Sequence, residues 1–247
     1  MQWEEHPDAG WVAALTGTSE ARATAALSEA AGERSVFRAI ERAHRAEGRS
    51  SYIEIDAPFE LYAIARLLRP QHIVEVGVSS GVSSAYLLAA CERNRKGTLH
   101  SVDLPKAPGR PHGRTRAPTA SWSIPPGRGS GWAVPFGLRA RWDLRLGDKG
   151  VVVPLLAEEL PRIDLVVYDV PHREADLDRE FRRLDPRLVP GGAAIADHGP
   201  SGDCCAPLAR WARRRGSHAQ RCQDLGLYGF RAAAPPRSGG SPARAAR

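Results

Sequence analysis

The stretch Glu75-Val76-Gly77-Val78-Ser79-Ser80-Gly81 decides the fold of this chain. It follows the β-branched run 72–76 and opens a helical pattern over residues 80–92, so it predicts a strand, a tight turn and a helix. Its glycines let the backbone turn sharply and approach a ligand, and the helix N-terminus offers free N–H groups to an anion. The spacing differs from the GxGxxG dinucleotide fingerprint. By itself, the turn is compatible with a ligand site and with an ordinary connection.

Strands and helices alternate on both sides of this turn, which is typical of a mostly parallel sheet covered on both faces. The sequence therefore predicts an α/β fold, Rossmann-like, with a mostly parallel seven-stranded sheet, helices on both faces and an N-terminal helical extension. Expected strands span residues 72–76, 98–104, 142–146, 163–170 and 192–196, with a closing hairpin or edge strand in 222–232. Expected helices span residues 35–48, 58–68, 80–92, 151–160, 173–184 and 204–215.

Composition shifts divide the chain into three parts. Residues 1–50 form a partly flexible N-terminal helical extension, in which residues 1–34 are Ala/Glu-rich with weak apolar periodicity. Residues 51–232 form the main domain. Within it, the Pro/Gly/Arg/Ser-rich segment 105–135 is longer than a passive connection needs and is expected to be a lid-like insertion. Residues 233–247 are of low complexity and are expected to be disordered.

Composition and charge exclude several classes of protein. The chain has 247 residues, is 42% hydrophobic, and has neither an apolar run long enough for a bilayer nor a signal-peptide pattern. Its four cysteines lack metal-finger spacing and are read as reduced thiols of a cytoplasmic protein. The net charge of +7 comes from two segments: residues 105–131, with five basic residues and no acid, and residues 231–247, with four arginines and no acid, while the rest of the chain is slightly acidic. We interpret both segments as solvated, not as a nucleic-acid surface.

Acidic residues stand at the ends of five expected strands. In open α/β sheets, ligands bind outside the carboxyl ends of the strands, near the point where the strand order reverses. An acid at the end of the second strand, Asp103, can accept hydrogen bonds from both ribose hydroxyls of a nucleoside. A nucleoside ligand without a pyrophosphate turn favours S-adenosylmethionine over NAD. The five acids are Glu75, Asp103, Asp148, Asp169 and Asp197.

Several short blocks, in order, resemble class I S-adenosylmethionine-dependent methyltransferases. More narrowly, the chain is similar to the methyltransferase-24 group, which is related to the catechol O-methyltransferase type. The blocks cover most of the chain from Ser51 to about Gly199. They are residues 67–70 leading to 73–77, 81–86, 101–105, 132–135, 144–148, 163–169 with His172, 188–192 and 196–198.

The resemblance implies a site for S-adenosylmethionine. Gly77 and Gly81 would pass close to its methionine part, Ser83 would bind the methionine carboxylate, Asp103 would hold the ribose and Asp148 would lie near the adenine. Two alternatives stay open: Ser83 as a local helix-cap residue and Asp148 as an ordinary turn acid. The implied cofactor set is Glu75, Gly77, Gly81, Ser83, Asp103 and Asp148.

The resemblance also places the chemistry. In catechol-type enzymes a divalent cation chelates the acceptor oxygens, and the corresponding ligand set here is Asp169, Asp197 and His198. Histidine departs from the amide or acid expected at its position and does not favour Mg²⁺, so a metal-free scheme stays equally open. His172, three residues beyond Asp169, is the candidate base, with Asp169 or Asp197 orienting a histidine. The alternative for His172 is a turn residue without a role.

The sequence thus predicts a methyltransferase that methylates a hydroxyl group of a small molecule. Alternatives are an N- or carboxylate-methyltransferase, a catalytically silent cofactor-binding protein, and a dehydrogenase, against which the glycine spacing counts. A nucleic-acid substrate is not favoured, because the chain lacks an Asn/Asp-Pro-Pro-aromatic run. A membrane partner is not expected, and a homodimer is left open.

Overall fold

The fold is taken from a computed structural model, which describes residues 8–47, 58–104, 124–125, 127–170, 174–197, 205–222 and 226–233. Its centre is a seven-stranded sheet in the order β3-β2-β1-β4-β5-β7-β6. The strands are β1 (His72–Val76), β2 (Thr98–Asp103), β3 (Trp142–Leu146), β4 (Ile163–Tyr168), β5 (Leu188–Asp197), β6 (Gln220–Arg221) and β7 (Leu227–Arg231).

The sheet is parallel except at one edge. Strands β1 to β5 pair in parallel, whereas β7 pairs antiparallel with β5 and with β6. The chain runs outward from β1 through β2 to β3 and then returns to β4 on the other side of β1. The strand order therefore reverses between β1 and β4, which is where such sheets bind ligands. This confirms the predicted Rossmann-like, mostly parallel seven-stranded α/β fold.

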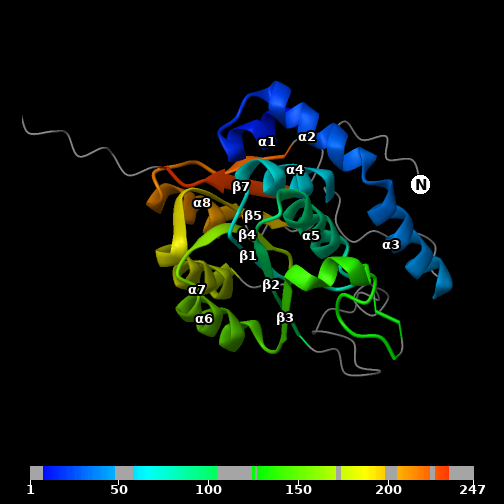
Figure 1. The fold of residues 1–247 in the computed structure, drawn as a ribbon. Coiled ribbons are helices and arrows are strands. Elements are labelled where there is room, and N and C mark those ends of the chain that lie inside the picture. The colour runs from blue at the N-terminus through cyan, green and yellow to red at the C-terminus, as the bar shows by residue number, and fades with distance from the viewer. Residues whose placement is uncertain are drawn as a thin grey trace, which may run out of the picture.

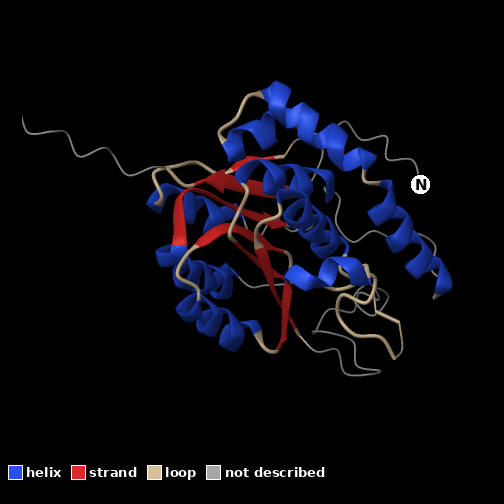
Figure 2. Ribbon diagram, viewed as in Figure 1, coloured by secondary structure: helices blue, strands red, loops and turns tan. Residues whose placement is uncertain are grey.

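Helices cover both faces of the sheet (Figures 1 and 2). On one face, α4 (Pro58–Leu68) and α5 (Val82–Asn94) pack on β1, β2 and β4 through alternate strand residues such as Ile73, Leu99 and Leu165. On the other face, the core is formed by α6 (Lys149–Glu159), α7 (Glu174–Leu184) and α8 (Cys205–Arg214). The intervening strand residues Val74 and Val166 point into this second core, as the two-residue repeat of a doubly buried strand requires.

Three N-terminal helices extend the first layer: α1 (Ala9–Thr16), α2 (Glu20–Gly32) and α3 (Arg34–Ala46). Trp11 and Leu15 of α1 are almost fully buried, and the Trp11 indole donates to the carbonyl of Gln220 (3.2 Å). Helix α2 packs on α4 and buries mainly alanines together with Leu27. Helices α1 and α2 therefore belong to the same hydrophobic core as the sheet. Helix α3 contributes Val36 and Ile40 to this core and lies on the outside of α5 (Figure 1).

Most expected elements occur where the residue pattern predicts them. Strands β1 and β3 and helix α4 have the expected bounds, whereas β5 begins at Leu188, four residues before the expected strand. Between β2 and β3 the described residues form only the short 3-10 helix η2 (Phe136–Arg141), and a second one, η3 (Asp185–Arg187), links α7 to β5. Across the described ranges, no helix combines the length and the apolar character needed to cross a bilayer.

Candidate functional site

The end of β1 meets the end of β4 at Gly77. The Gly77 N–H donates to the carbonyl of Val102 (2.9 Å), and the Asp169 N–H donates to the carbonyl of Val76 (2.8 Å). Gly77 has a positive φ of 100°, and a Cβ on it would overlap the carbonyl oxygen of Asp169. Only glycine fits here, because the backbone leaving β4 passes directly against it.

Gly81, the second glycine of the turn, is covered by a segment distant in the sequence. A Cβ on Gly81 would lie 2.5 Å from Cγ2 of Val134. The segment Gly131–Val134, which we call the strap, is bonded to the turn through its backbone. The Gly131 N–H donates to the carbonyl of Ser79 (2.8 Å), and the Ala133 N–H donates to the carbonyl of Ser80 (3.0 Å). The end of the expected lid-like insertion is therefore fixed on the glycine turn.

The strap is also held from the side of the sheet and from α3. The Arg139 guanidinium donates to the carbonyls of Gly131 (3.3 Å) and Val134 (3.0 Å). A Cβ on Gly131 would overlap the ring of Trp142, so that ring lies directly under the strap. On the outer side, the rings of Trp132 and His44 of α3 are 4.8 Å apart. The strap thus links the turn to α3.

Beneath the turn, Glu75 is completely buried and accepts hydrogen bonds from three serines. Its carboxylate is bonded to the hydroxyls of Ser83 (2.7 Å), Ser84 (2.6 Å) and Ser101 (2.6 Å). The Ser101 hydroxyl in turn accepts from the indole N–H of Trp142 (2.8 Å). Burial raises the pKa of Glu75, and the three hydroxyls oppose this by bonding to the charged form. This buried network ties β1, β2, β3 and the start of α5 together.

The network changes how two predicted cofactor residues can act. Glu75 has no exposed surface, so it acts on a ligand only through the residues that it positions. The Ser83 hydroxyl donates its proton to Glu75, which leaves its oxygen lone pairs as acceptors. Such a hydroxyl can accept a hydrogen bond from an ammonium group, and the contact between Ser83 and the methionine carboxylate that the resemblance implied stays a prediction.

Two further predicted residues end neighbouring strands. Asp103, at the end of β2, is half-buried and accepts a hydrogen bond from the backbone N–H of Ser79 in the turn (3.3 Å). Asp148 is exposed and caps α6 by accepting from the Gly150 N–H (2.7 Å). The structure thus brings Asp103 to the turn, whereas the Asp148 carboxylate serves as the helix cap that the alternative interpretation described.

The two candidate catalytic aspartates lie on adjacent strands. Tyr168 of β4 pairs with Ala196 of β5, and an aspartate follows each, so Asp169 and Asp197 are neighbours at the carboxyl edge. Both are half-buried. The other predicted residues here, His172 and His198, lie outside the described residues. Among the described residues, no group of three or more His, Cys, Asp or Glu side chains is arranged to hold a metal ion.

Behind Asp169, a buried ionic cluster that sequence reasoning missed supports the end of β4. The Lys149 ammonium group lies 2.7 Å from the Tyr168 hydroxyl and 3.0 Å from the Glu180 carboxylate, and Tyr168 donates to Glu180. Burial and the nearby Glu180 carboxylate raise the pKa of Tyr168. The cluster joins α6, β4 and α7. The only signal in the sequence is a lysine at the start of α6 and a glutamate inside an otherwise apolar helix face.

Comparisons with known proteins agree with this architecture. The sequence profile of the methyltransferase domain of the methyltransferase-24 group matches residues 74–198, about half of the chain. No curated protein sequence matches. Among solved structures, cofactor-bound Rv0187 from MTB is similar with 14% identity and a TM-score of 0.52, over 94% of this chain and 100% of that one.

The O-methyltransferase TomG from Streptomyces achromogenes, solved in complex with SAM, is similar with 16% identity and a TM-score of 0.50. That match covers 81% of this chain and 89% of TomG. At such identities the two structures support the fold alone. The match of the family profile to residues 74–198, which span the glycine turn and the ends of β2, β4 and β5, assigns the chain to a family. This protein is a member of the methyltransferase-24 group of class I S-adenosylmethionine-dependent methyltransferases.

Proposed function

We propose that this protein transfers the methyl group of S-adenosylmethionine to a hydroxyl group of a small molecule. The observation that carries the proposal is the hydrogen bond between the Ser79 N–H and the Asp103 carboxylate. This bond holds Asp103, at the end of β2, against the glycine turn that follows β1. The turn lies beside the point between β1 and β4 where the strand order reverses. A carboxylate in that position can accept both hydroxyls of a ribose, while the turn and the start of α5 receive the amino-acid part.

The residues at the turn fit the two ends of such a cofactor. Asp103 would bind the ribose, and the Ser83 oxygen would accept from the ammonium group of the methionine part. Gly77 and Gly81 would let the backbone of the turn lie against the methionine part. Glu75 acts as a positioning residue, because it fixes Ser83 from below. Asp148, which caps α6 at the end of β3, would border the adenine through its turn and not through a side-chain bond.

The bound cofactor supplies a methyl group already activated on a sulfonium. The protein then has two tasks: to hold the acceptor oxygen in line with that methyl group and to remove its proton. We assign proton removal to His172, three residues beyond Asp169. Asp169 and Asp197, adjacent at the carboxyl edge of β4 and β5, would orient the imidazole and the acceptor.

The same two carboxylates also provide two of the three ligands of a cation-assisted scheme, with His198 as the third. A divalent cation held there would lower the pKa of the acceptor hydroxyl. Two adjacent aspartates are common to both schemes. The structure therefore supports the aspartate pair in either role, and the choice depends on a measurement with and without metal.

The choice of a hydroxyl acceptor follows the description of TomG, which names that protein an O-methyltransferase. Transfer to an amine or a carboxylate on the same fold is the alternative. It predicts a different acceptor class and, for a carboxylate, no need for a base, because that acceptor carries no proton to be removed at neutral pH.

Calorimetric titration tests the cofactor. We expect S-adenosylmethionine and S-adenosylhomocysteine to bind and NAD not to bind. Asp103→Asn retains an acceptor oxygen for Ser79 but loses the charge, so it should weaken both sulfur nucleosides by about 10- to 100-fold. Asp176→Asn, at a partly exposed acid on α7 that pairs with Arg179, is the matched control and should leave both affinities unchanged. Folded protein that binds neither nucleoside would contradict the proposal.

Transfer of labelled methyl from the cofactor to a panel of hydroxylated, amino and carboxylate metabolites identifies the acceptor class. With a hydroxylated acceptor, His172→Ala should lower kcat by about 100-fold or more. An unchanged rate in that variant would remove the assigned base. Full activity after treatment with chelator would exclude the cation-assisted scheme.

A further inference from the structure

Arginines far apart in the chain gather at the end of the molecule opposite the glycine turn. Residues 182–190 and 210–222 together carry eight arginines and a single acid, Asp185. The first stretch ends α7 and leads through η3 into β5, and the second ends α8 and leads into β6. Both lie at the edge of the sheet where the parallel strands begin, whereas the candidate cofactor site lies at the edge where they end.

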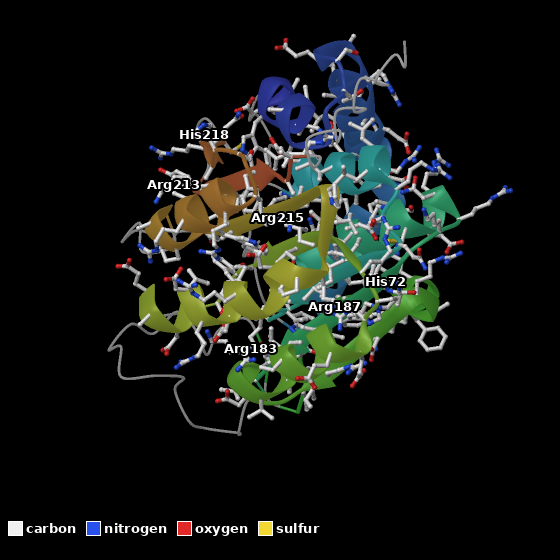
Figure 3. The ribbon with its side chains drawn as sticks, turned by 90° about the vertical axis from the view of Figure 1, so that its left-hand side faces the viewer. His72, Arg183, Arg187, Arg213, Arg215 and His218 are labelled. Carbon is white, nitrogen blue, oxygen red and sulfur yellow. The ribbon has the colours of Figure 1, made fainter. Side chains whose placement is uncertain are left out.

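Figure 3 shows this face of the molecule directly. The labelled side chains come from the beginning of β1, the ends of α7 and α8, and the residues that follow those helices. They extend across one face from the first strand to the C-terminal hairpin. We call these six residues the basic face: His72, Arg183, Arg187, Arg213, Arg215 and His218.

Two arginines of the basic face have no acidic partner among the residues that the structure describes. Arg183 and Arg213 are exposed, and neither forms an ion pair with any other residue that the structure describes. Their neighbours behave differently: Arg182 and Arg210 are directed to acids on α7, at 4.0 Å from Asp178 and 2.8 Å from Glu174 respectively. Burial lowers the pKa of His72, so the positive charge of the face comes from its arginines, and it is only partly compensated within the described part of the chain.

Two other arginines are held in place by the backbone. Arg187 donates through Nε to the carbonyl of Ala157 (2.9 Å), and Arg215 donates through one terminal nitrogen to the carbonyl of Leu188 (2.5 Å). The Nε of Arg215 also lies 3.6 Å from the Asp185 carboxylate. Each guanidinium has five N–H donors in a planar fork, so these bonds fix its orientation and leave further donors available. Such pre-positioned guanidinium groups suit phosphate oxygens, which they bind in a bidentate manner.

Helix electrostatics explain part of this arrangement and not all of it. Basic residues in the last turns of α7 and α8 complement the negative end of each helix dipole. Arg187 and Arg215, however, follow their helices, and Asp185 is the sole acid among the residues of both stretches. The helix dipole accounts for one or two basic residues at the end of each helix. The stretches 182–190 and 210–222 contain more arginines than that.

The arginines of the basic face come from separate elements. They lie at the end of α7, in η3, at the end of α8 and directly after α8, and the Ala233 N–H after β7 donates to the carbonyl of Arg215 (3.0 Å). Positive charge distributed in this way suits several phosphates of a long polyanion better than a single small anion.

We propose that the basic face binds the phosphate backbone of a double-helical nucleic acid, independently of methyl transfer. Phosphate contacts from arginines need no base-reading element and supply sequence-independent affinity. Phe136, the one aromatic among the exposed large apolar residues that the structure describes, lies in η2 and not on this face, so the described part of the face lacks the stacking platform typical of single-strand binding. None of the exposed large apolar residues belongs to it either, which disfavours insertion into a lipid surface.

Fluorescence anisotropy of the full chain with a labelled 20-base-pair duplex, at increasing salt concentrations, tests the proposal. We expect binding that weakens steeply with salt. The double variant Arg183→Gln/Arg213→Gln removes the two charges that have no acidic partner among the described residues, so it should weaken binding at least 10-fold and reduce the slope of log affinity against log salt by about 2. The matched control Arg38→Gln/Arg42→Gln makes the same change in net charge at two exposed arginines of α3 and should leave the affinity within about twofold.

Several results would overturn the proposal. Absence of duplex binding at low salt would do so directly. An equal loss in the α3 control would mean attraction by net charge alone, without a defined face. Tighter binding to phosphatidylglycerol vesicles than to the duplex would assign the face to membranes. The basic face lies opposite the edge of the sheet that holds the candidate cofactor site, so saturating S-adenosylhomocysteine should leave the affinity for the duplex unchanged. Competition between S-adenosylhomocysteine and the duplex would contradict binding of the duplex on the basic face. None of these measurements depends on methyl transfer.

Discussion

The side chain of Val134 occupies the space that a side chain on Gly81 would need. A Cβ on Gly81 would lie 2.5 Å from Val134 Cγ2 and 2.9 Å from the Gly131 Cα. The glycine at the start of α5 is therefore required by a contact within the protein, between the turn and the strap, in addition to its positive φ of 92°. The turn and the strap should accordingly respond to mutation as one unit.

Gly81→Ala should lower the free energy of unfolding by about 2–3 kcal/mol, because it combines backbone strain with overpacking. Val134→Ala opens space on the other side of the contact. In the double variant part of the loss should be recovered, giving a coupling energy of roughly 1 kcal/mol in urea denaturation. Strict additivity of the two single changes would show that the contact does not form in solution.

Trp142→Phe keeps a ring beneath the strap but removes the donor to Ser101, at the far end of the Glu75 network. If Glu75 positions Ser83, the variant should bind S-adenosylmethionine about 5-fold more weakly, the effect of one hydrogen bond. Binding of 5′-methylthioadenosine, which lacks the amino-acid part, should not change. Calorimetry with both ligands measures the difference.

The comparison of the two ligands separates positioning from general damage. An equal loss for both would mean that Trp142 supports the fold and not the amino-acid end of the site. Ser101→Ala interrupts the same network one residue further in and should reproduce the selective loss. This prediction depends on the proposed cofactor, since protein that binds neither ligand gives no difference to measure.

Lys149→Met should destabilise the protein through Glu180. The variant leaves a carboxylate that is 4% exposed without its ammonium partner. Breaking a buried ion pair costs about 3–5 kcal/mol, and the partial exposure of Lys149 reduces this to roughly 2 kcal/mol. Lys149→Met/Glu180→Gln removes the orphaned charge and should be more stable than Lys149→Met alone. Lys96→Met, at an exposed site, is the control and should be neutral in urea denaturation.

Acid should weaken the attachment of α2 to α4 through Glu29. Arg66 donates to both oxygens of Glu29 and, as the main cause, lowers the pKa of that carboxyl from 4.5 to about 2. Because the pKa of Glu29 is lower in the folded protein than in the unfolded chain, the ionised carboxylate stabilises the fold above pH 4.5. This stabilisation is lost as the pH falls towards 2. Glu29→Gln should therefore reduce the drop in unfolding free energy between pH 5 and pH 2.5, whereas the exposed control Glu158→Gln should retain it.

The regular part of the fold was predictable because its signals are local. Three elements have the expected bounds, because each shows its own hydrophobic periodicity or is bounded by glycine or proline. They are the strand 72–76, the helix 58–68 and the strand 142–146. Helices α1 and α2 gave weaker signals. Helix α2 is buried largely through alanines, whose small apolar area contributes little to a periodic pattern even when they are completely covered. The early start of β5 was missed because Pro190 and Gly191 interrupt its pattern.

The candidate site was predictable to the extent that strand ends define it. Asp103, Asp169 and Asp197 lie at the expected edge because the carboxyl ends of parallel strands meet there. The strap was not predictable, since its bonds to Ser79 and Ser80 use main-chain atoms that leave no signature in residue type. The interpretation of charge was incomplete for a similar reason. It located excess charge in contiguous segments, whereas the basic face gathers arginines that only the fold brings together.

The strap has a consequence for how this protein can be altered. The chain leaves the sheet after Asp103 and returns to the turn at Gly131, and both residues are bonded to the same glycine turn. Two neighbouring fixed points therefore bound the sequence that connects Asp103 to Gly131. We expect a change in the length of that connecting sequence to leave the glycine turn in place, because the bonds that hold the turn lie outside it.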